Sequence, residues 1–150
     1  MSFPDNIENS ELDELYTQVI FDHYKNPRNK RALNKFSFEH RGFNPLCGDE
    51  IIIQLNISEL GLITDVSFQG TGCSISQASA SILTEIVKNK SVEEVQLMIN
   101  DFRGILESNQ KGSIEFDDLK ALEGVKKFPV RIKCALLSWV TLEEILEIRS

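Results

Sequence analysis

Apolar residues recur at intervals of three and four near the start of the chain, a spacing that predicts an amphipathic helix. They are Leu12, Leu15, Tyr16, Val19 and Ile20. Ser10 stands where an N-cap belongs, and the acidic residues after it suit the positive end of the helix dipole. Pro27 disfavours helical geometry in the residue before it, so we expect the helix to end near residues 25–26. A polar, mildly basic loop over residues 26–35 follows.

Three runs rich in β-branched and aromatic residues then predict strands. The first begins at residues 36–38, the second and clearest covers residues 50–57, and the third covers residues 62–68. The short connection over residues 58–61 is typical of a hairpin loop, so the second and third strands should be antiparallel neighbours. The sequence therefore predicts a small antiparallel sheet of about three strands.

Helical patterns return after the strands. An Ala- and Ser-rich stretch predicts a helix over residues 74–88, and Ser91 opens a capping box that starts another helix. Residues 107–116 are polar and predict a loop before a short helix over residues 117–122. The last helix follows Pro129 and presents one broad apolar face. That face consists of Ala135, Leu136, Trp139, Leu142, Ile145 and Leu146. Strands followed by helices, both with apolar faces, indicate an α+β fold.

Length and charge restrict the class of protein. At 150 residues the chain fits one domain, and we expect residues 1–150 to form it, with residues 1–9 flexible. The net charge of −7 and the lack of a basic stripe argue against nucleic acid as a partner. No run of about 18 apolar residues predicts a membrane span, and the acidic start lacks the apolar core of a secretory signal. We therefore expect a cytoplasmic protein, in which thiols stay reduced.

The three cysteines, Cys47, Cys73 and Cys134, are the candidate reactive groups. An odd number leaves one thiol outside any set of intramolecular disulfides, and a reducing compartment favours metal binding or catalysis instead. Cys73 follows two nearby glycines and precedes a predicted helix, whose N-terminus favours a thiolate. From its position alone, Cys73 could equally be a small apolar residue of the core.

Asp49 adds a carboxylate to the cysteines. It lies two residues after Cys47, and side chains two apart in an extended segment point to the same side. Cys134 is expected to open the last helix. Three sulfurs and one oxygen are enough for a tetrahedral zinc site. These donors are Cys47, Asp49, Cys73 and Cys134. His23 and His40 are the alternative fourth ligands, although His23 lies among polar residues and is expected at the surface or at an interface.

Four segments of the chain match those of a known family in the same order. The first is Asp22–Asn29, with the sequence DHYKNPRN. The others are Cys47–Asp49, Gly72–Ser74, and Cys134 after Pro129–Lys133. These segments resemble the IscU/NifU-N/SufU family of iron–sulfur cluster assembly proteins, and the resemblance covers residues 10–148. It implies a SufE/NifU-like α+β fold in which the three cysteines and the aspartate converge at one exposed end.

Two features resemble the SufU branch of this family. Lys133 stands where IscU-type scaffolds carry a histidine before the third cysteine, and the stretch around residues 100–120 resembles an insert. Resemblance to SufU implies a zinc-dependent sulfurtransferase that binds Zn²⁺ through the four donors named above. It also implies two kinds of partner, a SufS-type cysteine desulfurase that supplies persulfide sulfur and the downstream iron–sulfur assembly proteins.

On this hypothesis Cys47 accepts the sulfur, while Asp49, Cys73 and Cys134 keep the metal. Arg131, which is near in sequence, could steer the negatively charged persulfide or could be an ordinary surface arginine. The alternative function is a non-enzymatic scaffold on which a [2Fe–2S] cluster is assembled and passed on, because thiolates bind either metal. A purely structural zinc ranks last, because a domain of this size can fold without one.

Overall fold

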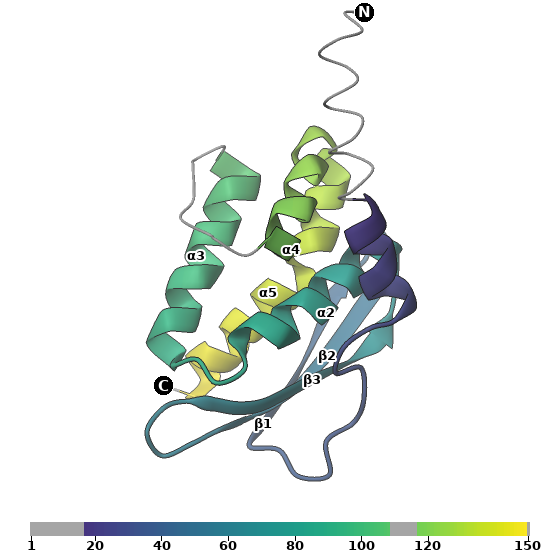
Figure 1. Ribbon diagram of the computed structural model, residues 1–150. Helices are drawn as coiled ribbons and strands as arrows, with labels where there is room; N and C mark the ends of the chain where they lie inside the picture. Colours follow the sequence, from purple (N-terminus) through teal and green to yellow (C-terminus); the bar gives the residue numbers. More distant parts are fainter. Residues whose placement is uncertain (1–16, 109–116, 150) are drawn as a thin grey trace, which may run out of the picture.

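A three-stranded antiparallel sheet forms one layer of the protein (Figure 1). The structure is a computed structural model that describes residues 17–108 and 117–149. The strands are β1 (Phe38–Asn44), β2 (Asp49–Ile57) and β3 (Ile63–Thr71), with β2 in the centre. The predicted sheet and hairpin are confirmed. β3 continues to Thr71 instead of ending at residue 68, because its last residues pair with the start of β2.

The helices follow the predicted order. They are a helix described over residues 17–25, α2 (Ser74–Val87), α3 (Val92–Ser108), α4 (Asp117–Lys120), the 3₁₀ helix η1 (Ala121–Lys127) and α5 (Pro129–Arg149). Residues 107–108 were predicted as loop but extend α3, where Glu107 pairs with Arg103 one turn earlier. The predicted helix start at Ser10, residues 1–9 and the rest of the predicted loop lie outside the described residues. Within the described ranges, no helix combines the length and apolar character that crossing a bilayer requires.

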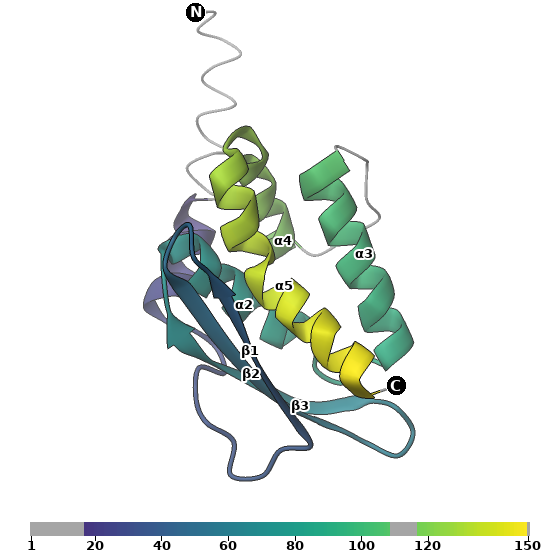
Figure 2. The same cartoon turned by 180° about the vertical axis from the view of Figure 1, so that it is seen from behind.

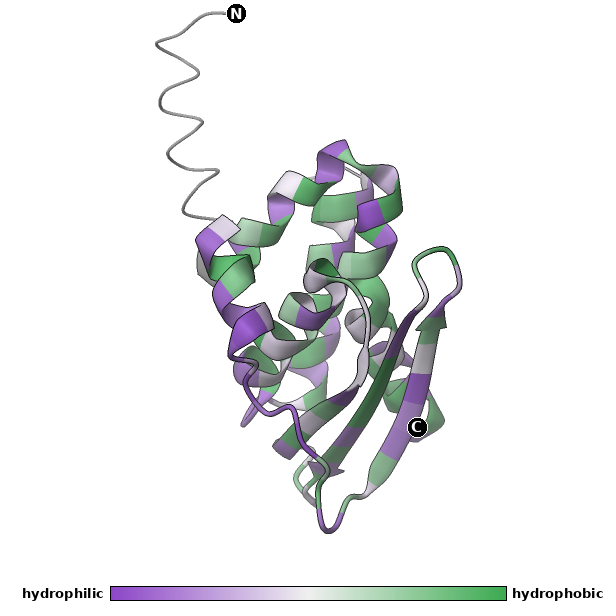
Figure 3. Ribbon diagram, turned by 90° about the vertical axis from the view of Figure 1, so that its right-hand side faces the viewer, coloured by the Kyte–Doolittle hydropathy of each residue, from purple (hydrophilic) through white to green (hydrophobic). Residues whose placement is uncertain are grey.

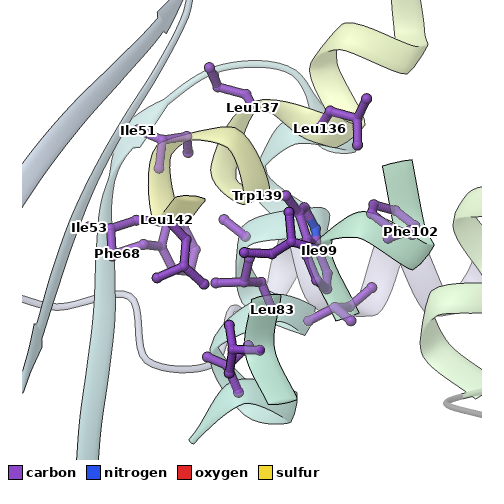
Figure 4. Packing of buried hydrophobic residues seen from close by; sticks show 14 of the residues in the cluster. Ile51, Ile53, Phe68, Leu83, Ile99, Phe102, Leu136, Leu137, Trp139 and Leu142 are labelled. Atoms are coloured by element: carbon purple, nitrogen blue, oxygen red, sulfur yellow. The ribbon is translucent and has the colours of Figure 1, made fainter. Parts of the chain in front are cut away.

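The helices cover one face of the sheet in two layers. α5 packs over β1 and β2, α2 packs over β3, and the two helices contact each other (Figures 1 and 2). α3 packs against α5. In Figure 3 the strands are seen at the lower right, and most of the helices lie to the left of them and above. Ile51 and Ile53 of β2 and Phe68 of β3 meet Leu142 of α5 in the core between the layers (Figure 4).

Trp139 fixes the position of α5 along α2. The tryptophan is fully buried, and its Nε1–H donates to Ser79 Oγ on α2 at 3.0 Å. The Ser79 hydroxyl in turn donates to the carbonyl of Ala135 at 2.6 Å, and the indole packs 4.6 Å from the ring of Phe102. A buried indole N–H needs an acceptor, so sliding α5 along α2 would break both hydrogen bonds. This packing therefore also fixes the residues at the start of α5.

Candidate metal site

The four predicted site residues come from four segments that meet at one end of the sheet. Cys47 lies in the turn between β1 and β2, and Asp49 is the first residue of β2. Cys73 is the N-cap of α2, two residues after β3 ends, and Cys134 lies in the second turn of α5. The register brings them together, because the last residue of β1 pairs with Asp49 and the last residue of β3 pairs with the next residue of β2.

Cys47, Asp49 and Cys134 form a compact donor set. Their ligand atoms all lie within 4.8 Å of one another, and Cys47 Sγ is 2.9 Å from Cys134 Sγ. A disulfide would bring the sulfurs to about 2.05 Å, so both cysteines are free thiols. Asp49 and Cys134 are buried, whereas Cys47 is partly exposed. Cys47 therefore carries the accessible sulfur of this compact set, and the neighbouring Cys73 is partly exposed as well.

Cys73 contacts this set through Asp49. The backbone N–H of Cys73 donates to Asp49 Oδ1 at 2.8 Å, and its Sγ lies 3.8 Å from Asp49 Oδ2. Gly72 permits this approach, because a Cβ there would overlap Asp49 Oδ1 and lie 2.6 Å from Ser76 Oγ. All four predicted residues are neighbours, with Cys73 Sγ at the edge of the compact set.

Two details of the sequence-based picture were wrong. Cys47 and Asp49 do not share an extended segment, because Gly48 between them has a φ of +68°, in the left-handed region that favours glycine. Cys134 does not open the last helix, since α5 already begins at Pro129. Cys134 therefore lies beyond the first turn of α5, outside the reach of the helix N-terminus. Burial, followed by hydrogen bonds to Cys47 and Asp49, raises the pKa of the Cys134 thiol.

Asn44 is a site residue that the sequence analysis missed. Its buried side chain donates from Nδ2 towards Cys134 Sγ at 3.9 Å and accepts the backbone N–H of Leu46 on Oδ1 at 3.2 Å. Its carbonyl accepts the backbone N–H of Cys47 at 3.3 Å. One residue thus links the turn that carries Cys47 to the sulfur on α5. The available signal was an asparagine followed by proline at a strand end, a pair that favours turn formation.

Arg131 places a positive charge beside the thiols. Electrostatic attraction to Cys73 is the largest cause that raises the pKa of Arg131, followed by a hydrogen bond with Cys134. The arginine is exposed, and it lies one turn before Cys134 on α5. It therefore places a positive charge on the solvent side of the cysteine cluster.

The two histidines lie outside the donor set of the described residues. His23 was expected at the surface or an interface, but it is only 2% exposed, and its Nδ1 is 2.8 Å from Ser81 Oγ on α2. The backbone N–H of Arg28 donates to the same hydroxyl at 2.8 Å. The hydrogen bonds of His23 and Arg28 therefore hold the first helix and the loop after it against α2. His40 lies on β1, with Nε2 3.6 Å from a glutamate oxygen of α5.

The donor set fits zinc. An ionised carboxylate that is removed from water needs a compensating charge, and Asp49 is fully buried beside three thiols. Zinc binds thiolate and carboxylate in tetrahedral sites. The lengths of its bonds and the tetrahedral angle place neighbouring ligand atoms roughly 3.5–3.8 Å apart. The 3.8 Å between Cys73 Sγ and Asp49 Oδ2 matches this spacing. The sulfurs of Cys47 and Cys134 would move apart by about 1 Å to reach it.

Comparison with known protein families shows which family the chain belongs to. The sequence matches the family described as NifU-like N terminal domain over residues 15–135. The chain belongs to this family. The matched range contains all four predicted site residues, so the donor set is part of the family domain.

Named relatives cover nearly the whole chain. The zinc-dependent sulfurtransferase SufU of Bacillus subtilis is 46% identical over 137 residues, which are 91% of this chain and 92% of that protein. The iron–sulfur cluster assembly scaffold protein IscU of Streptococcus pyogenes is 37% identical over 136 residues, which are 90% of this chain and 84% of that protein. These similarities confirm the resemblance to SufU and IscU that the motifs predicted.

Solved structures confirm the α+β fold. A Fervidobacterium islandicum protein, described as a scaffold for iron–sulfur cluster assembly in the SUF system, superposes with a TM-score of 0.81 at 30% identity. The alignment covers 85% of this chain and 93% of that one. The N-terminal NifU-like domain of Brucella abortus gives the same TM-score at 21% identity, covering 93% and 99% of the two chains. At that identity the second likeness concerns the fold alone.

Proposed function

We propose that this protein is a zinc-dependent sulfurtransferase of iron–sulfur cluster biogenesis, which accepts persulfide sulfur on Cys47 from a cysteine desulfurase. The observation that carries the proposal is the asymmetry of the cysteines. Cys47 and Cys73 are both partly exposed, whereas Cys134 is buried in α5, and of the two exposed sulfurs only that of Cys47 belongs to the compact set with Asp49 and Cys134. The cysteine that accepts sulfur must be accessible to a second protein, whereas a buried cysteine is better suited to stay on the metal. The 46% identity to a protein named as a zinc-dependent sulfurtransferase supports the same conclusion.

Four residues would hold the metal. They are Cys47, Asp49, Cys73 and Cys134. Zinc, when bound, would keep the thiols in the thiolate form and so protect them from protonation and oxidation. The chain prepares the site before any metal binds. Asn44 orders the turn of Cys47, Gly72 lets the backbone of Cys73 approach Asp49, and Cys73 itself is the N-cap of α2, at the positive end of the helix dipole.

The transfer step is a thiol exchange at sulfur. The Cys47 thiolate attacks the outer sulfur of the desulfurase persulfide, and a new bond to Cys47 Sγ forms as the persulfide S–S bond breaks. The desulfurase cysteine leaves as a thiolate with the electron pair of that bond. The outer sulfur keeps its proton, so Cys47 ends as a persulfide without any external oxidant or reductant. The positive charge of Arg131 beside the cluster would stabilise the negative charge of the attacking and leaving thiolates.

A scaffold for cluster assembly is the second candidate. The 37% identity to a scaffold protein over 90% of the chain favours it. Three thiols and a carboxylate would also hold a [2Fe–2S] cluster, since iron–sulfur clusters are bound mainly by thiolates. In that case the cluster is cargo that the protein passes on to apo-proteins, and Cys47 is one ligand among equals.

Stimulation of the desulfurase separates the two candidates. Zinc-loaded protein is added to a SufS-type cysteine desulfurase with cysteine and a reductant, and the rate of sulfide release is measured. We expect a large increase that Cys47→Ala abolishes, with the circular dichroism spectrum as the control for folding. No acceleration by the wild-type protein, together with stable cluster assembly from iron and sulfide, would favour the scaffold. In the same series Asp49→Ala should retain zinc less tightly, and unchanged zinc affinity would remove Asp49 from the ligand set.

A further inference from the structure

A groove of about 920 Å³ lies beside the cysteine cluster. It is bounded by the first helix, the first turn of α2, η1 and the start of α5. Several apolar side chains line it, among them Ile20, Ile75 and Val125. Phe128 and Val130 also line the groove, and they are 59% and 54% exposed. Large apolar side chains gathered in an exposed hollow are typical of a site where another molecule docks.

The groove is also basic. Lys127 and Arg131 line it, and residues 126–133 contain four cations and no carboxylate, in a chain whose net charge is −7. Within the described part of the chain, no carboxylate forms a salt bridge with Lys127 or Arg131. A hollow with this lining complements a segment that carries both apolar and acidic side chains.

The groove is continuous with the cysteine cluster. Ser74, at one side of the groove, directly follows Cys73. Arg131 lines the groove and also lies beside the thiols of Cys73 and Cys134. A segment that fills the groove up to Arg131 would therefore hold the rest of its protein next to the cluster.

We propose that this groove binds an acidic, apolar segment of the protein that donates sulfur to Cys47. The inference rests on the proposed function, because it takes the cysteine desulfurase as the partner. Continuity with the cluster selects the donor as the occupant, since the donor is the protein whose reactive sulfur must be held there. Lys127 lies outside the donor set, so its charge contributes to docking without taking part in the exchange at sulfur.

Direct binding tests the proposal independently of sulfur transfer. Zinc-loaded protein is titrated onto immobilised SufS-type desulfurase, and Kd is measured for the wild type, Lys127→Glu, Phe128→Ala and a control, Lys35→Glu. Lys35 is exposed before β1, and its carbonyl accepts from Asn56 near the end of β2 remote from the cysteines. The control therefore changes the net charge as much as Lys127→Glu does.

We expect Lys127→Glu to raise Kd about tenfold at low ionic strength and to have less effect at high salt, because the contact is electrostatic. Phe128→Ala should raise Kd severalfold at both salt concentrations, and Lys35→Glu should leave it within twofold of the wild type. Zinc content and melting temperature of each variant show that the site and the fold are intact.

Three results would overturn the proposal. The first is a Kd for Lys127→Glu and Phe128→Ala equal to that of the control. The second is a sedimentation coefficient of Lys127→Glu that differs from the wild-type value in the absence of the desulfurase, which would assign the groove to a second copy of the chain. The third is a loss of the Lys127→Glu effect after removal of residues 2–16, which would assign the groove to that segment. Tight groove-dependent binding without stimulation of the desulfurase would instead refute sulfur transfer and leave the docking surface in place.

Discussion

Replacing Gly72 by alanine should weaken metal binding although none of the proposed ligands is replaced. An added Cβ would overlap Asp49 Oδ1 and lie 2.6 Å from Ser76 Oγ. The Ser76 oxygen would have to move by about 0.8 Å to an ordinary contact distance, and the carboxylate must move as well. Overpacking of this kind costs about 1–3 kcal/mol. Displacing a group that positions a metal ligand typically lowers the affinity by about 10- to 100-fold.

The assay is competition with a zinc chelator, together with thermal unfolding of the metal-free protein. Gly124→Ala is the matched control, because a Cβ at Gly124 meets nothing within 4 Å and its backbone is not in the left-handed region. We expect Gly124→Ala to bind zinc like the wild type and Gly72→Ala to bind it at least tenfold more weakly. Equal zinc affinity in both variants would refute the conclusion that the absence of a side chain at position 72 permits the approach of Cys73 to Asp49 that the site needs.

Three other predictions follow from the described contacts. Asn44→Ala should lower zinc affinity about tenfold, and Asn44→Asp, which keeps only the acceptor, should be equally weak if the amide donor matters; chelator competition measures both. His23→Ala should lower the free energy of unfolding by about 1–3 kcal/mol in urea titrations while leaving one zinc per chain. The hydrogen bond from Arg28 is the main cause that lowers the pKa of Asp22 below 3.8. The hydrogen bond between Arg28 and Asp22 therefore stabilises the fold above pH 3.8, and this stabilisation is lost as the pH falls and Asp22 becomes protonated. An NMR titration of Asp22 in the Arg28→Ala variant should show a higher pKa for Asp22 than in the wild type.

Local sequence patterns were sufficient for most of the fold. β2 is a run of β-branched residues next to a short connection, so both its extent and its antiparallel partner follow from neighbouring residues. The apolar face of α5 includes Trp139, whose burial requires a large packed core and which the structure places at its centre. The three extra residues of β3 were not predictable, because they are held by pairing with β2 and are not themselves apolar.

The four predicted donors are neighbours in the structure, but the contacts that bring them together could not be predicted from the sequence. Cys47 and Asp49 were correctly paired, but the turn through Gly48 brings them together instead of an extended segment. His23 has polar neighbours in sequence, and its burial depends on Ser81, which is 58 residues away. Asn44 meets Cys134 across 90 residues, a contact that no local pattern contains. Packing between residues far apart in the sequence therefore determines where His23 and Asn44 lie.

The most direct test of the account is to locate the transferred sulfur. Zinc-loaded protein is mixed with a SufS-type desulfurase and cysteine for a single turnover, thiols and persulfides are alkylated, and the peptides are analysed by mass spectrometry. The account predicts one additional sulfur atom on the peptide that contains Cys47, and none on those that contain Cys73 or Cys134. Sulfur found first on Cys73 or Cys134, or an unmodified Cys47 while the desulfurase turns over, would contradict it.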